Sequence, residues 1–355
     1  MDALFSPASI GAAALTSCAG AALALALSFG SEKQDKGTEG HHKAGSVGAD
    51  IASGRAFSSK STGLSLAYRV WRPARAPECV VCILHGFGEH AARYDHVAEE
   101  LCGSAGALVV AFDQQGHGAS EGVRAHAERF EDLVTDGMGF LEFAQGAGLI
   151  AAELPLFLLG HSMGGLIAAR MADRIASGAG AAGVSCDTRA GGVRLAGLVL
   201  TSPFFMVAPE HDTALLRAAS SFLSSALPLL PVVAMDLPAL ARDDSVRSQY
   251  RSDPLVYHGL VRARMGAELA AATRAICADA ESLTFPPLLL MYGGADRIVH
   301  PDGSKRVGSA CTIVGGGEKT VVEMEGGFHE ILNDVDRREV LARVVAFLVE
   351  HTRPA

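Results

Sequence analysis

The stretch that decides the fold is Leu156-Phe-Leu-Leu-Gly-His-Ser-Met-Gly-Gly165. Its apolar start, Leu156–Leu159, predicts a short buried strand, and the run Leu166–Ile175 after it suits a helix. The pentapeptide between them, Gly160-His-Ser-Met-Gly164, matches G-x-S-x-G, a motif that places a serine on a sharp turn from a strand into a helix. Ser162 is therefore the candidate nucleophile.

On both sides of this motif, short apolar runs alternate with longer segments that suit helices, such as Val335–Glu350. Most of the runs are continuously apolar, which is typical of parallel strands buried on both faces. The alternation predicts an α/β domain with a mostly parallel central sheet flanked by helices. The candidate strands are Leu64–Val70, Val80–Leu84, Leu108–Phe112, Leu156–Leu159, Leu195–Leu200, Leu288–Tyr292 and Thr320–Met324.

A serine hydroxyl is a weak nucleophile and needs a base, and chains with this elbow place the acid and then the histidine after the serine. His329 follows the last candidate strand and is the expected base. Asp296 follows the preceding strand, just beyond a Gly-Gly turn, and is expected to fix the tautomer of His329. Asp302 is a competing acid that lies further from the strand end.

Two backbone N–H groups are needed to hold the oxyanion. The first is expected from Met163, the residue after the nucleophile. The second is expected from Phe87, in the loop His85-Gly-Phe-Gly-Glu-His90 that follows the strand Val80–Leu84.

Residues 204–285 hold no convincing strand and predict a helical insertion over the site, which we call the cap. Inside it, apolar residues at helical spacing share one face of a helix, and Arg and Ser residues occupy the other face. We interpret the apolar face as partly packed against the main domain and partly open to a membrane or micelle. Its residues are Leu215, Leu216, Ala219, Phe222, Leu223, Ala226 and Leu227.

The first 55 residues differ in composition from the rest of the chain. Residues 3–31 carry no charge, and Ala8–Gly30 spans 23 residues, enough to cross a bilayer as a helix. We interpret residues 1–30 as a membrane anchor or a leader, residues 31–55 as a flexible linker, and residues 56–355 as one catalytic domain. If this run anchors the protein in a membrane, the lysines after it predict that the catalytic domain faces the cytoplasm; a soluble cytoplasmic protein is the alternative.

The chain of 355 residues carries a net charge of −9 and no dense stripe of Lys or Arg, so nucleic-acid binding is excluded. Cys79 and Cys82 form a C-x-x-C pair, but they lie in a predicted buried strand, where residues i and i+3 point to opposite faces. We therefore expect no metal site, no redox chemistry and no organic cofactor.

Taken together, the motifs resemble the monoacylglycerol lipase and lysophospholipase branch of the α/β-hydrolase family over roughly residues 60–350. The resemblance implies a Ser162–His329–Asp296 triad under a mobile apolar cap. It also implies that Glu89 and Arg93 lie near the alcohol end of the substrate; a structural ion pair is the alternative for these two. The matching blocks are His85–Tyr94, Phe112–Gly122, Gly160–Gly165, Asp253–Gly259, Tyr292–Val299 and Gly327–Glu330.

The activity that the resemblance implies is hydrolysis of monoacylglycerol-like, single-chain lipid esters to fatty acid and glycerol through an acyl-enzyme. A membrane surface is the expected partner, contacted by the cap and by the N-terminal segment. Other enzyme activities stay open, namely lysophospholipase, general carboxylesterase, acyltransferase and peptidase. A non-catalytic binding protein on the same scaffold is the alternative of another class.

Overall fold

The computed structural model describes residues 55–186 and 192–352. The anchor or leader predicted for residues 1–30 lies outside the described residues, as does the predicted linker up to residue 54. Within the described ranges, no helix combines the length and the apolar character that crossing a membrane requires.

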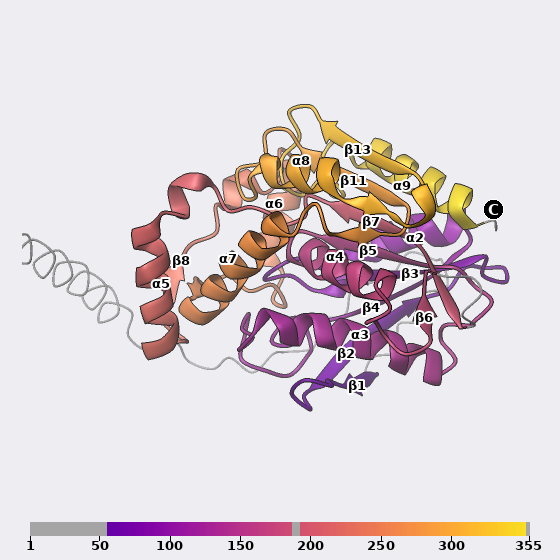
Figure 1. Ribbon diagram of the computed structural model, residues 1–355, viewed down its shortest axis with the longest axis horizontal. Helices are drawn as coiled ribbons and strands as arrows, with labels where there is room; N and C mark the ends of the chain where they lie inside the picture. Colours follow the sequence, from indigo (N-terminus) through magenta and orange to yellow (C-terminus); the bar gives the residue numbers. More distant parts are fainter. Residues whose placement is uncertain (1–54, 187–191, 353–355) are drawn as a thin grey trace, which may run out of the picture. The chain divides into compact units, whose positions relative to one another are not determined.

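A nine-stranded sheet lies at the centre of the described domain, in the order β1-β2-β4-β3-β5-β7-β11-β13, with β6 paired to β7 (Figure 1). The strands from β4 to β13 in this order pair in parallel, whereas β1 and β2 are antiparallel to their neighbours. Every predicted strand is confirmed, with ends that differ by no more than two residues. The strands are β1 (Ala56–Ser58), β2 (Ser65–Trp71), β3 (Cys79–Leu84), β4 (Ala107–Phe112), β5 (Leu156–His161), β6 (Val184–Ser185), β7 (Val193–Thr201), β11 (Leu288–Gly293) and β13 (Lys319–Met324).

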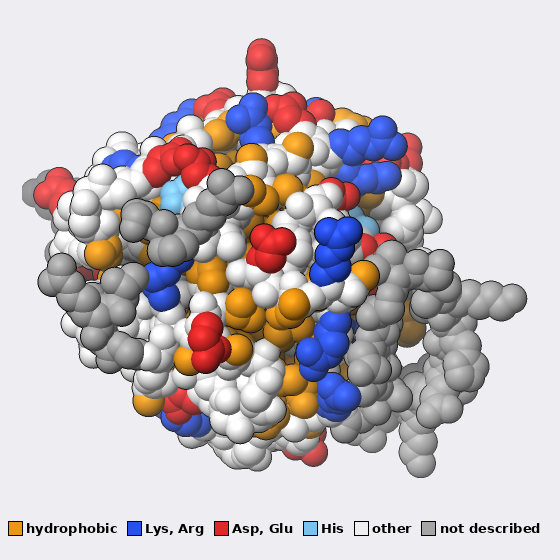
Figure 2. All heavy atoms as spheres, turned by 90° about the vertical axis from the view of Figure 1, so that its right-hand side faces the viewer, with side chains coloured by type: hydrophobic (Ala, Val, Ile, Leu, Met, Phe, Trp, Pro, Cys, Tyr) orange, Lys and Arg blue, Asp and Glu red, His pale blue; other side chains and the backbone are white. Residues whose placement is uncertain are grey.

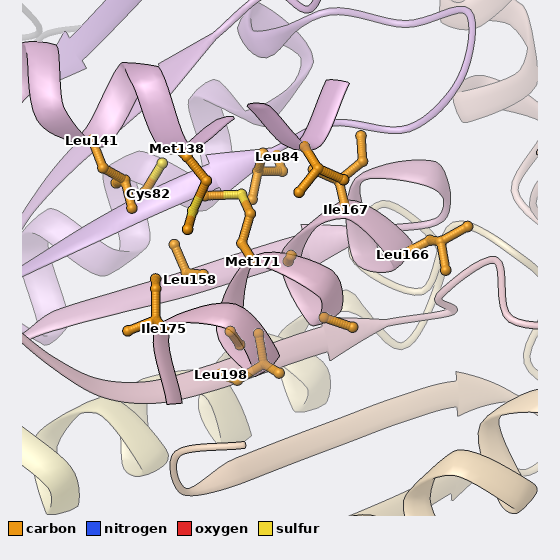
Figure 3. Packing of buried hydrophobic residues seen from close by; sticks show 14 of the residues in the cluster. Cys82, Leu84, Met138, Leu141, Leu158, Leu166, Ile167, Met171, Ile175 and Leu198 are labelled. Carbon is orange, nitrogen blue, oxygen red and sulfur yellow. The ribbon is translucent and has the colours of Figure 1, made fainter. Parts of the chain in front are cut away.

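Helices cover both faces of this sheet. Alternate side chains of the central strands point to opposite faces, and each face packs against helices in a core of its own. Cys82 points into the core formed with α3, α4, α7 and α8, and Figure 3 shows Cys82 there with Leu84 and Met171. Cys79 points into the other core, formed with α2 and α9. The predicted fold and the predicted opposite orientation of the two cysteines are thereby confirmed. The helices are α2 (Asp95–Ser104), α3 (Phe130–Gly146), α4 (Met163–Ala176), α7 (Ala263–Ala278), α8 (Pro301–Ala310) and α9 (Arg337–Thr352).

Between β7 and β11 the chain leaves the sheet and forms the cap, which contains the helices α5 (Ala214–Ala226), α6 (Asp244–Ser252) and α7. The prediction that this span holds no strand was wrong in detail. β8 (Pro231–Val233) pairs antiparallel with β9 (Val261–Arg262), and β10 (Thr284–Phe285) pairs with β12 (Thr312–Ile313). Segments of two or three residues carry no periodic pattern of their own, so only their distant partners define them.

The apolar face of α5 points away from the protein. Leu215 is 75% exposed and Phe222 is 70% exposed, whereas Ser224 is buried. This face was expected to be packed only in part, and Leu215 and Phe222 belong to its exposed part. Helical spacing shows which residues share a face but not which face meets the protein. At the end of the domain away from α5, Figure 2 shows hydrophobic side chains scattered among charged ones.

Candidate active site

Ser162 lies on the turn between β5 and α4 with φ of 51° and ψ of −119°. This region is rarely occupied by residues other than glycine and stores strain. The flanking glycines permit the turn, because a Cβ atom on Gly164 would lie 2.0 Å from the carbonyl oxygen of Leu84. A Cβ atom on Gly160 would lie 2.4 Å from the carbonyl oxygen of Gly164. The motif is therefore required for close approach of strand, turn and helix.

His329 and Asp296 form a buried pair. The Nδ1 atom of His329 donates a hydrogen bond of 2.7 Å to Oδ2 of Asp296. The other carboxylate oxygen accepts the backbone N–H groups of Ile298 at 2.8 Å and Val299 at 3.0 Å, which fixes its orientation. Nε2 of a neutral His329 is then the nitrogen with a free lone pair. Asp302 lies apart on α8, where its Oδ2 atom is 3.7 Å from Nδ1 of His300.

The loop of residues 327–333, which we call the base loop, reaches the serine turn. The ring of His329 lies 4.9 Å from the ring of His161, the residue before Ser162. Within the described residues, no hydrogen bond joins the side chains of Ser162 and His329. Catalytic hydrogen bonds of this kind often tighten only when substrate binds.

Electrostatics separate the roles of the two neighbouring histidines. Burial disfavours a charged ring at His329, but the carboxylate of Asp296 outweighs it and raises the pKa of His329. Burial and the proximity of His329 lower the pKa of His161 to about 4. His161 therefore stays neutral near pH 7, and His329 is the ring suited to accept a proton.

The loop His85–His90, which we call the donor loop, lies against the serine turn, since a Cβ atom on Gly86 would be 3.2 Å from Cβ of Ser162. Neither the N–H of Phe87 nor that of Met163 donates a hydrogen bond to another residue in the described part of the chain. Both groups are thus available to a ligand oxygen, as an oxyanion hole requires.

His85 braces the donor loop. Its Nδ1 donates to the carbonyl oxygen of Gly86 at 2.7 Å, and its Nε2 accepts the backbone N–H of Gln114 at 2.9 Å. These partners define one neutral tautomer, and burial lowers the pKa of His85. The side-chain amide of Gln114 also donates to the carbonyl oxygen of His85, so the loop is held from both sides.

Glu89 and Arg93 form the ion pair that the sequence analysis left as an alternative to substrate binding. Arg93 also contacts Glu330, a residue that sequence reasoning missed. Glu330 lies 237 positions after Arg93, so the sequence does not indicate that they pair. The signal that could have drawn attention to Glu330 is its position directly after His329.

The assembled groups suit acyl transfer: a strained serine, a histidine oriented by a carboxylate, and two unused N–H donors. Within residues 55–186 and 192–352, no group of three or more His, Cys, Asp or Glu residues is placed to hold a metal ion.

Comparison with known proteins confirms the predicted resemblance. The family model described as serine aminopeptidase, S33, matches residues 75–336. The monoacylglycerol lipase of Mycolicibacterium smegmatis is 33% identical over 81% of this chain and 94% of its own length. The human monoglyceride lipase is 33% identical over 75% of this chain and 80% of its own length. The crystal structure of the monoacylglycerol lipase of Paleococcus ferrophilus superposes with a TM-score of 0.64, at 29% identity, over 81% of this chain and 99% of that one. The chain therefore belongs to the serine aminopeptidase, S33, family of hydrolases, in the group that contains the monoacylglycerol lipases.

Proposed function

We propose that this protein is a serine lipase that hydrolyses monoacylglycerols to fatty acid and glycerol. The observation that carries the proposal is the buried His329–Asp296 pair beside the strained turn of Ser162. The relatives named as monoacylglycerol lipases support the substrate class, since they match most of the chain. A lysophospholipase, a general carboxylesterase and a non-catalytic binding protein have no comparable observation in their favour.

In the proposed mechanism, Oγ of Ser162 attacks the ester carbonyl while Nε2 of His329 takes the hydroxyl proton. The N–H groups of Phe87 and Met163 hold the oxyanion, and Asp296 stabilises the imidazolium. The imidazolium then protonates the leaving glycerol oxygen as the carbon–oxygen bond breaks, which leaves the acyl group on Ser162. Water, deprotonated by His329, attacks this acyl-enzyme, and His329 returns the proton to Oγ of Ser162 as the acyl–oxygen bond breaks and the fatty acid leaves.

Competition for a fluorophosphonate label tests the substrate class. We expect the probe to label Ser162, and a long-chain monoacylglycerol to protect at a concentration at least about tenfold lower than a lysophospholipid or a short ester, a difference of about 1.4 kcal/mol. Equal or better protection by the lysophospholipid would instead identify a lysophospholipase. A wild-type protein that takes up no label would contradict the enzymatic function itself.

We further propose that the cap docks on a lipid surface, which would deliver a substrate that is poorly soluble in water. Seven of the eleven large apolar side chains that are exposed in the described domain lie in the cap, and exposed apolar patches are typical of surfaces that bind a membrane or another protein. The serine that α5 buries, Ser224, leaves the apolar side chains outward. The exposed set is Leu215, Leu216, Phe222, Leu227, Leu229, Val232 and Val233.

Co-sedimentation with phosphatidylcholine liposomes tests the docking. Burial of one Leu or Phe side chain is worth roughly 1.5–3 kcal/mol, so Leu215→Ser with Phe222→Ser should lower the partition coefficient by more than about tenfold. The control is Val335→Ser with Val349→Ser, which removes exposed apolar side chains outside the cap. Equal loss in both double variants, or none in either, would count against docking by α5.

A further inference from the structure

Arg93 connects the two loops that carry the proposed oxyanion donor and the proposed base. Its Nη1 atom donates to Oε2 of Glu89 at 2.5 Å and to Oε1 of Glu330 at 2.6 Å. Its Nη2 atom donates to Oε2 of Glu330 at 2.8 Å. Glu89 lies in the donor loop two residues after Phe87, and Glu330 follows His329 in the base loop. One guanidinium group therefore bridges both loops.

Glu89 links Arg93 to the backbone of the donor loop. Its Oε1 atom accepts the N–H of Gly86 at 2.6 Å and the hydroxyl of Tyr94 at 2.7 Å. Gly86 precedes Phe87 and lies close to the serine turn, so the carboxylate holds the peptide directly before the one that carries the Phe87 N–H. Burial opposes ionisation of Glu89, but Arg93 prevails and holds its pKa at about 2.

Protein groups enclose both carboxylates and most of the Arg93 side chain, which is 10% exposed. Glu89 and Glu330 are each 2% exposed, and the aromatic ring of Tyr250 lies 4.8 Å from the guanidinium carbon of Arg93. A buried ion pair adds little net stability, because desolvation offsets most of its attraction, so geometric specificity is the better explanation for it. The bidentate contact with Glu330 requires the planar fork of arginine.

We propose that Arg93 is a positioning residue, which fixes the donor loop and the base loop relative to each other through Glu89 and Glu330. The proposal rests on the proposed serine-hydrolase function. It differs from direct recognition of the alcohol, because the carboxylates and the guanidinium already satisfy one another. A misplaced donor loop or base loop would slow attack on every ester, whatever its leaving group.

The test compares substrates with and without glycerol. Arg93→Lys keeps the charge but loses the fork, and we expect kcat to fall about 10- to 100-fold, since a displacement of about 1 Å can cost about 100-fold. The fall should be equal for a monoacylglycerol and for the p-nitrophenyl ester of the same fatty acid, with KM changed less than about twofold. The rate of labelling by a fluorophosphonate, which carries no glycerol, should fall in parallel.

Matched variants complete the design. Glu330→Gln keeps the shape and one acceptor oxygen and leaves Arg93 paired with Glu89, so it should show a smaller loss of the same kind. Arg343→Lys is the control, because Arg343 pairs with Glu339 on the exposed surface of α9. A loss confined to the monoacylglycerol, or a rise in KM alone, would overturn positioning in favour of alcohol recognition. Full activity of both Arg93→Lys and Glu330→Gln would overturn it as well. Failure of the serine-hydrolase function would appear separately, as absence of labelling in the wild-type protein.

Discussion

Replacing Ser162 by Ala is expected to lower kcat for ester hydrolysis by roughly 10⁴–10⁶-fold, because His329 then has no hydroxyl to deprotonate. The fold should persist, since the contacts of this turn come from the backbone. The N–H of Ser162 donates to the carbonyl oxygen of Thr201 at 3.1 Å, and its own carbonyl oxygen accepts the N–H of Phe204 at 2.9 Å. The measurements are kcat with a monoacylglycerol, labelling by a fluorophosphonate, and the midpoint of thermal unfolding.

The matched control is Ser304→Ala, which removes the hydroxyl of another buried serine, in α8. This control should keep its activity and its label. A Ser162→Ala variant that retains more than about 1% of wild-type kcat would show that another residue is the nucleophile. Loss of label together with a lowered unfolding midpoint would instead indicate damage to the turn.

The sheet could be predicted because each of its central strands is a continuous apolar run, as in Val80–Leu84 and Leu288–Tyr292. The burial of such strands on both faces leaves a signal in the local sequence. The orientation of a surface helix relative to the rest of the protein leaves no such signal in the local sequence. Helical spacing predicts which residues share the apolar face of α5, but the residue of this helix that is buried is Ser224, and no periodic pattern indicates that choice.

The candidate site was predictable to the extent that it depends on the ends of strands. Ser162, Asp296 and His329 each follow a recognisable strand, and the carboxyl ends of parallel strands meet at one edge of the sheet. The pairing of Arg93 with Glu330 was not predictable, because the two residues meet only when the chain folds and brings two distant loops together. The local sequence around a charged residue does not indicate which residue 237 positions away will pair with it.

Replacing Asp296 by Asn is expected to lower kcat by about 10⁴-fold, through the wrong tautomer of His329. Oδ1 of Asp296 accepts two backbone N–H groups, so the amide oxygen of the asparagine should keep that position. The NH₂ group then faces Nδ1 of His329 and donates to it. A neutral ring must place its proton on Nε2, which can no longer accept the proton of Ser162.

The pH profile of kcat/KM should also change in a defined direction in this variant. Only neutral His329 acts as a base, so wild-type kcat/KM should fall as pH drops through a pKa above about 6.5, the usual value for histidine. Loss of the Asp296 charge leaves burial as the dominant influence on His329, so the acid limb of the remaining activity should move to lower pH. Asp302→Asn is the control, because it neutralises a largely exposed carboxylate on α8 and should change neither kcat nor the profile. If Asp302→Asn caused the larger loss, Asp302 would be the orienting acid and the contact between Asp296 and His329 would have another role.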